Sequence, residues 1–137
     1  MKTYVLDACS LIAYINDEKG AEVTDSLIRN SRKGKCEIYM HQLNYLEVYI
    51  DIARTSNIKQ AEKLRELISD LNIHIAYDLS EKIVKEAAIL KAKFKISLAD
   101  SVLLAFAKTS KAEVVSSDHH EFDIIESATK IKFKWIR

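Results

Sequence analysis

The stretch Lys2-Thr3-Tyr4-Val5-Leu6-Asp7-Ala8-Cys9-Ser10-Leu11-Ile12 decides the fold. Residues 2–6 are predicted to form a short apolar strand, and an apolar helix is predicted after Asp7, over residues 9–17. Asp7 therefore lies at the carboxyl end of a strand, where open α/β sheets bind their ligands. Val114-Val115-Ser116-Ser117 predicts a second short strand, and it ends at Asp118 in the same way.

Strands and helices alternate along the rest of the chain. Strands separated by helices imply parallel βαβ units. We therefore expect an α/β fold in three layers, with a central parallel sheet flanked by helices, and the length of 137 residues fits one domain over residues 1–137. Further helices are predicted over 22–33, 42–55, 58–71, 81–95, 98–109 and 119–126, and further strands over 36–40, 73–77 and 130–136.

The composition is that of a globular protein, with 48% hydrophobic and 30% charged residues. A net charge of +1 excludes a strongly basic nucleic-acid coat protein, but it allows a nuclease with a local basic face. No apolar run approaches the ~20 residues of a membrane helix, and the chain begins directly with a strand. We expect a cytoplasmic protein without a signal peptide or a membrane partner.

Two further acids, Glu47 and Asp100, interrupt apolar helical stretches. Together with Asp7 and Asp118 they make four carboxylates that are far apart in sequence, each in apolar company. A buried carboxylate without a partner costs several kcal/mol or takes up a proton, so a shared cation is the best common explanation. Carboxylate oxygens suit Mg²⁺ or Mn²⁺, which keep several waters and bind few carboxylates plus a substrate phosphate.

Three of these acids also have a purely structural interpretation. Asp7 and Asp118 could each be the N-cap of the helix that follows. Ser97 and Asp100 have the spacing of a capping box, so Asp100 could simply satisfy a helix N-terminus. Convergence favours the metal interpretation, because parallel strands present their carboxyl ends on one edge of the sheet.

Glu47 has a structural interpretation as well, because it shares one helix side with Asn44, Asp51 and Arg54, and such a pattern taken alone is typical of a solvated face. His119 and His120 have the wrong spacing for a shared metal on one helix. The strand over 130–136 alternates lysines with Ile131, Phe133 and Trp135, which favours inward aromatic residues and leaves a phosphate-binding role of the lysines open.

The chain resembles PIN-domain ribonucleases over essentially its whole length, and in size and pattern it resembles the VapC toxins of bacterial and archaeal VapBC pairs. The motifs that carry the resemblance are Tyr4-Val5-Leu6-Asp7-Ala8-Cys9-Ser10-Leu11-Ile12, Leu43-Asn44-Tyr45-Leu46-Glu47-Val48, Ile96-Ser97-Leu98-Ala99-Asp100-Ser101 and Val114-Val115-Ser116-Ser117-Asp118-His119-His120-Glu121-Phe122.

The resemblance implies an activity, a cofactor and partners. It implies an endoribonuclease that uses Mg²⁺ or Mn²⁺ to hydrolyse phosphodiester bonds of single-stranded or loop RNA. It also implies a VapB-like antitoxin and a homodimer of the toxin. The catalytic and metal-binding acids carried over by position are Asp7, Glu47, Asp100 and Asp118.

Some positions depart from the family pattern. Cys9 stands where Ser, Thr or Asn is common, with Ser10 next, so it stays open which side chain assists the metal or a water. Ser116 stands where Thr is common, and Asp123 is an extra acid without an assigned role.

Three other functions remain as alternatives. The first two are a housekeeping PIN nuclease without an antitoxin and a non-catalytic PIN-like binding module. A magnesium-dependent phosphatase or receiver domain is the third and fits less well. Asp7-Ala8-Cys9 lacks the second acid of a phosphatase Asp-x-Asp motif, and Leu6-Asp7 lacks the acidic pair of a receiver.

Overall fold

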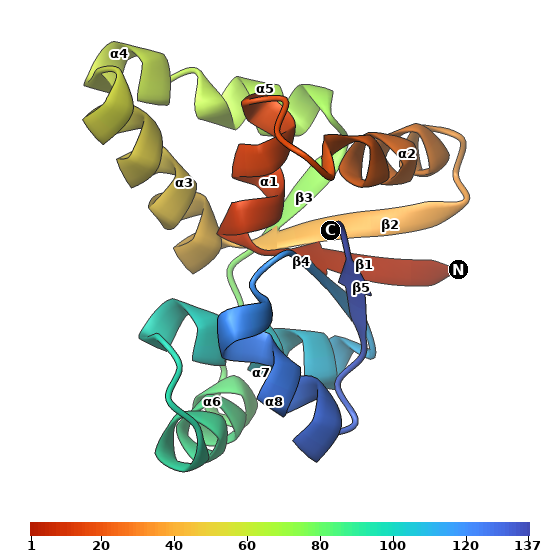
Figure 1. Ribbon diagram of the computed structural model, residues 1–137, viewed down its shortest axis with the longest axis vertical. Coiled ribbons are helices and arrows are strands. Elements are labelled where there is room, and N and C mark those ends of the chain that lie inside the picture. The colour runs from red at the N-terminus through yellow and green to blue at the C-terminus, as the bar shows by residue number, and fades with distance from the viewer.

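A five-stranded parallel sheet forms the centre of the protein in the computed structural model, which describes residues 1–137 (Figure 1). The strand order is β3-β2-β1-β4-β5, and each neighbouring pair is parallel. The strands are β1 (Lys2–Leu6), β2 (Cys36–His41), β3 (Ile73–Ala76), β4 (Glu113–Ser116) and β5 (Phe133–Trp135).

Helices cover both faces of this sheet. One face carries α1 (Ala8–Ile15), α2 (Ala21–Arg32), α3 (Gln42–Thr55), α4 (Ile58–Ala61) and α5 (Leu64–Asp70). The other face carries α6 (Glu81–Lys93), α7 (Leu98–Ser110) and α8 (His119–Ala128). Figure 1 shows these two groups above and below the sheet. The expectation of a three-layer α/β fold with a central parallel sheet is confirmed.

The hydrophobic core divides into two clusters, one on each face of the sheet. Tyr4 and Leu6 of β1 join the cluster under α1, α2 and α5, whereas Val5 joins the cluster under α6, α7 and α8. Successive strand residues point to opposite faces, so a strand buried on both faces must be apolar at nearly every position. This explains why β1 has no alternating polar residues before Asp7.

Two predicted elements were wrong in extent. Residues 58–71 were predicted as one helix, but the chain turns at Glu62 and Lys63 and separates α4 from α5. The strand over 130–136 is reduced to β5, which pairs with β4 alone. Its Phe133 and Trp135 are half-buried and not fully inward.

The C-terminal residues pack against the turn between α1 and α2. Gly20 lies there with φ +97°, and a Cβ at this position would come within 2.6 Å of the carbonyl oxygen of Ile136. The Arg137 side chain donates to the carbonyl of Lys19 at 2.6 Å. A glycine is required here for both the positive φ and the close approach.

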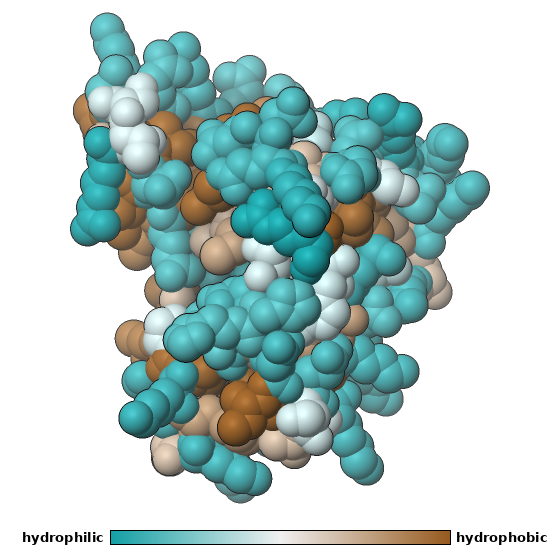
Figure 2. Space-filling model, viewed as in Figure 1, coloured by the Kyte–Doolittle hydropathy of each residue, from teal (hydrophilic) through white to brown (hydrophobic).

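The face of the molecule shown in Figure 2 is mostly hydrophilic, with apolar side chains in scattered patches. None of the helices combines the length and the apolar character needed to cross a bilayer.

Candidate metal site

The first carboxylate of the site, Asp7, directly follows β1 and is 2% exposed. Its Oδ1 accepts a hydrogen bond from the backbone N–H of Ser10 at 2.8 Å, which caps α1. Its Oδ2 accepts a hydrogen bond from the hydroxyl of Ser116, the last residue of β4. Asp7 is therefore fixed from two sides, by the helix that follows it and by the neighbouring strand.

Ser116 links the ends of the two neighbouring strands. Its Oγ donates to Asp7 and accepts from the backbone N–H of Asp118 at 2.9 Å. Asp118 in turn caps α8, because its Oδ1 accepts from the N–H of Glu121 at 3.1 Å. Ser10 donates its hydroxyl to the carbonyl of Asp7 at 3.0 Å, so its side chain also serves this turn.

Glu47 reaches the site from α3, which begins directly where β2 ends. The amide Nδ2 of Asn44, one turn earlier, donates to Glu47 Oε1 at 3.0 Å. Asn44 is fully buried and Glu47 is half-buried, so the alternative interpretation of this helix side as a solvated face is wrong. The face is occupied because α3 packs against α1 and α7.

Asp100 lies in the first turn of α7, and its backbone N–H is capped by the Ser97 hydroxyl at 3.1 Å. Ligand atoms of Asp100, Asp118 and Glu121 all lie within 4.8 Å of one another. Glu121 was not predicted as a site residue. Its signal was the spacing Asp118-x-x-Glu121, which places both residues on the same side of the first turn of α8.

The pKa values follow from burial and from the crowding of negative charges. Burial raises the pKa of Asp7 to about 6, although the hydrogen bonds from Ser116 and Ser10 oppose this rise. Burial raises the pKa of Asp100 to about 9, and hydrogen bonding to Glu121 and the charges of Glu121, Glu47 and Asp7 add to it. Burial and the charge of Glu121 also raise the pKa of Glu47, against the hydrogen bond from Asn44.

No lysine, arginine or histidine lies within 4.0 Å of any carboxylate of the site. We call these five acids the carboxylate cluster; its members are Asp7, Glu47, Asp100, Asp118 and Glu121. The donor set is all oxygen and negatively charged, and without a cation the raised pKa of Asp100 keeps a proton on this residue at neutral pH. These properties fit a hard divalent ion such as Mg²⁺ or Mn²⁺. The assignment of the individual acids as ligands stays a prediction.

Cys9 lies beside this cluster. Burial raises the pKa of its thiol to about 12, and the charges of Asp7, Asp118, Asp100 and Glu47 add to the effect. The residue is nevertheless solvent-accessible. The thiol is therefore protonated at neutral pH, and its pKa depends on the negative charge of the cluster.

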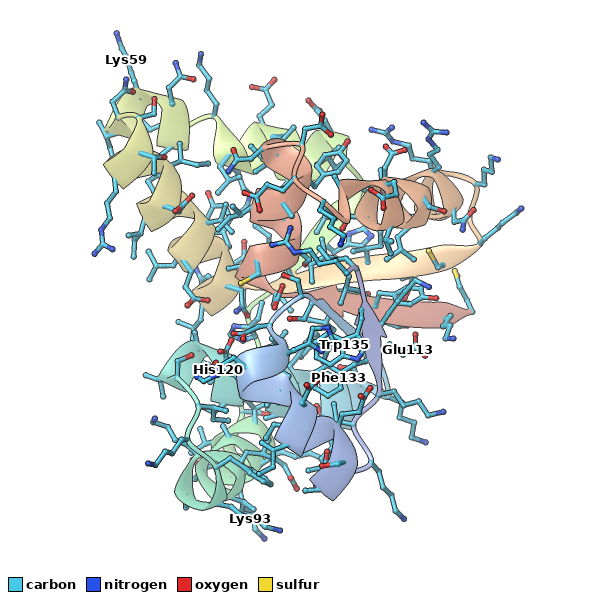
Figure 3. All side chains as sticks on the ribbon, viewed as in Figure 1. Lys59, Lys93, Glu113, His120, Phe133 and Trp135 are labelled. Carbon is cyan, nitrogen blue, oxygen red and sulfur yellow. The ribbon has the colours of Figure 1, made fainter.

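An aromatic stack joins the start of α8 to β5, and its first member, His119, directly follows Asp118 in the chain. The His119 and Trp135 rings are stacked at 3.8 Å between centroids, and the Trp135 and Phe133 rings at 5.2 Å. Figure 3 shows Phe133 and Trp135 side by side along β5. Asp123, which had no assigned role, accepts a hydrogen bond from His119 Nδ1 at 2.8 Å, so it orients this stack.

Comparison with solved structures identifies several with the same fold. One chain of VapBC-1 from nontypeable Haemophilus influenzae shares 17% identity, covers 98% of both chains and has a TM-score of 0.72. DNA-bound VapBC from Salmonella typhimurium shares 15% identity over 100% of both chains, with a TM-score of 0.73. A toxin-antitoxin complex from Klebsiella pneumoniae shares 17% identity over 87% of this chain and 89% of that chain, with a TM-score of 0.64.

Comparison by sequence gives a family match but no individual relative. No curated protein matches the sequence. The family model described as the PIN domain matches residues 4–126, a region that contains all five acids of the carboxylate cluster. Because this match spans most of the chain, the protein belongs to the PIN-domain family.

Proposed function

We propose that the protein is a metal-dependent endoribonuclease and the toxin of a VapBC-type pair. Asp7, Glu47, Asp100 and Asp118 would be its metal-binding and catalytic acids, with Glu121 as a fifth member. The observation that carries this proposal is the convergence of Asp100, Asp118 and Glu121, without a cation partner, at the carboxyl edge of the sheet. The charges of Asp7 and Glu47 are close enough to raise the pKa of Asp100 further. Membership of the PIN-domain family supports the nuclease chemistry.

The chemistry fits the groups present. Hydrolysis of a phosphodiester needs an activated water and relief of negative charge on the phosphate, and a bound Mg²⁺ or Mn²⁺ supplies both. Asp118 and Glu121 would hold the ion from the start of α8. Asp7, fixed by Ser10 and Ser116, holds its position without reorganisation. Asp100 would join them from the first turn of α7.

Cleavage assays on a panel of structured RNAs test the nuclease. With Mg²⁺ or Mn²⁺ we expect cleavage that EDTA abolishes. Asp100→Asn and Glu121→Gln should each reduce the rate about 100-fold or more, because each removes one charge from the ion and one acceptor from the site. Asp70→Asn, an exposed acid of α5, is the matched control and should cleave normally. Cleavage that is indifferent to EDTA would refute the metal-dependent mechanism, and binding of RNA without any cleavage would favour a non-catalytic binding module.

An antitoxin partner is proposed from the fold neighbours, which are described as VapBC and toxin-antitoxin complexes. A groove of about 500 Å³ between α1, α3 and the α4–α5 segment supports it, because Ile12, Ile15, Ile52 and Leu67 give it an apolar lining. A VapB-like antitoxin would dock an apolar segment there. It would also place an Arg or Lys in the carboxylate cluster, where no cation of this chain reaches.

We propose further that the toxin forms a homodimer and acts in the cytoplasm as a single PIN-like domain over residues 1–137. Co-expression of this gene with its neighbouring open reading frame tests the partner and the dimer. We expect a stable complex in size-exclusion chromatography with light scattering. Elution of this chain alone as a monomer would refute both the proposed antitoxin partner and the proposed dimer. RNA cleavage by that monomer would then indicate a housekeeping PIN nuclease.

A further inference from the structure

A second cavity, of about 560 Å³, lies at the edge of the sheet opposite the carboxylate cluster. Its walls come from the amino ends of β1 and β4, the carboxyl ends of α6, α7 and α8, and the segment that leads into β5. Thr3 lines this cavity and Asp7 lies in the cluster, so roughly 13 Å of β1 separates the two sites. They share no residue.

The floor of the cavity is apolar. Phe94 contributes an aromatic ring, Leu90 and Ala107 are buried core residues, and Ile89 is 51% exposed at the wall. A half-exposed isoleucine beside a phenylalanine leaves apolar surface in contact with solvent. The volume lies within the range of about 300–1,000 Å³ that is typical of small-molecule sites.

The rim of the cavity is strongly basic. Two of its lysines are neutralised, since Lys2 pairs with Glu113 at 3.1 Å and Lys108 pairs with Glu86 at 2.8 Å. The other rim lysines have no carboxylate within 4.0 Å and leave the rim with excess positive charge; they are Lys93, Lys111, Lys130 and Lys132.

Helix geometry accounts for only part of this pattern. Lysines are common at helix carboxyl ends, because they face the partial negative charge there. Lys93 is the last residue of α6 and Lys111 caps α7, so both fit this explanation. Lys130 and Lys132 lie beyond α8 on the way to β5, and the helix dipole gives no reason for an apolar hollow between all four side chains.

We propose that this cavity binds a small amphipathic anion. A carboxylate, sulfonate or phosphate group would lie at the rim of unpaired lysines, and an apolar chain or ring would lie against Phe94 and Ile89. An RNA strand or an acidic peptide fits less well, because either would leave the partly enclosed apolar floor empty. The site is independent of the carboxylate cluster and of the proposed nuclease activity.

Fluorescence of anilinonaphthalene sulfonate, an anion with an apolar ring system, provides the test on the full chain in EDTA. We expect saturable binding that decanoate and naphthyl phosphate displace, and that decanol and inorganic phosphate displace far less. The double variant Lys93→Glu/Lys132→Glu should weaken probe binding about tenfold, through loss of two attractive charges and gain of two repulsive ones. Displacement by decanoate and displacement by naphthyl phosphate, measured separately, distinguish a carboxylate ligand from a phosphate ligand.

Lys59→Glu is the matched control, because Lys59 is an exposed lysine of α4 at the end of the molecule farthest from Lys93 in Figure 3. It should bind the probe like wild type. Ile89→Asp tests the apolar lining of the cavity. Because Ile89 is partly exposed, this variant is compatible with folding even if the double variant unfolds.

Three results would overturn the proposal. The first is unchanged probe binding by folded Lys93→Glu/Lys132→Glu or by Ile89→Asp. The second is displacement by decanol that equals displacement by decanoate. The third is displacement by a short RNA or an acidic peptide without displacement by either small anion, which would assign the surface to a macromolecule.

Discussion

Replacement of Asp7 by Asn separates a helix cap from a metal ligand. Asn retains the shape of the side chain, and its Oδ1 can still accept from the N–H of Ser10, so the cap of α1 survives. Its amide can donate to Ser116 Oγ in place of accepting from it. The substitution mainly removes one buried negative charge.

The magnitude follows from the pKa of Asp7, which rises from 3.8 to about 6 on burial. This difference corresponds to about 3 kcal/mol that ionisation of Asp7 costs the metal-free protein at pH 8. The Ser116 hydroxyl loses its acceptor in the variant, at a cost of about 1 kcal/mol. The metal-free variant should therefore be about 2 kcal/mol more stable than wild type, which for a chain of this length raises the melting temperature by about 7 °C.

Added metal should reverse this order. At a concentration of Mg²⁺ or Mn²⁺ about 100 times its dissociation constant, binding to the native state stabilises wild type by about 2.7 kcal/mol. Asp7→Asn should gain much less and should lose RNA cleavage. Differential scanning fluorimetry at pH 8, with EDTA and then with metal, measures both effects, and Asp70→Asn serves as the control. An equal metal-induced shift in both proteins, or full cleavage by Asp7→Asn, would refute the assignment of Asp7 as a ligand.

Three further perturbations test the structure. The metal-free protein should lose stability as pH rises from about 4 to 9, because the raised pKa values of Asp7 and Asp100 mean that the native state binds more protons than the unfolded state. Added Mg²⁺ should make the free energy of unfolding depend less on pH. Urea unfolding across this pH range measures the dependence, and the same dependence with and without Mg²⁺ would contradict the prediction. Iodoacetamide should modify Cys9 faster once a cation neutralises the cluster, because the negative charges no longer raise the pKa of the Cys9 thiol. Mass spectrometry measures the rate, with buried Cys36 as the internal control. A Cys9 rate that does not change with metal would contradict this charge effect. Gly20→Ala should destabilise the fold by more than about 1 kcal/mol, because the new Cβ would meet the Ile136 carbonyl at a positive φ, and an unchanged urea midpoint would count against that contact.

The sequence predicted the layers and the sheet because apolar strands and amphipathic helices alternate along it. It also predicted that Asp7 and Asp118 each follow a strand, and the structure adds that these two strands are neighbours. The turn at Glu62 was not predictable, because the apolar spacing continues through it from Ala61 to Leu64. Tertiary packing, not local pattern, divides this segment into two helices.

The composition of the site was harder to predict than its location. Glu121 follows His119 and His120 in a polar run, and only the start of α8 at Asp118 shows that its carboxylate turns back toward Asp100. The burial of Asn44 was equally hard to predict. Its side chain lies on the same helix face as Glu47, and the face is buried because α7 packs against α3, a contact between segments far apart in sequence.

Capping and metal binding are compatible functions of the same carboxylates. Asp118 uses Oδ1 for the cap of α8 and leaves Oδ2 without a protein donor. Asp7 uses one oxygen for the cap of α1 and the other for Ser116, yet a carboxylate oxygen has a second lone pair that a cation can use. The caps hold each carboxylate in one orientation before any ion binds, so little conformational entropy is lost when it does. Helix capping was the alternative interpretation of Asp7 and Asp118. In this arrangement the caps orient both carboxylates toward the site, so capping supports metal binding.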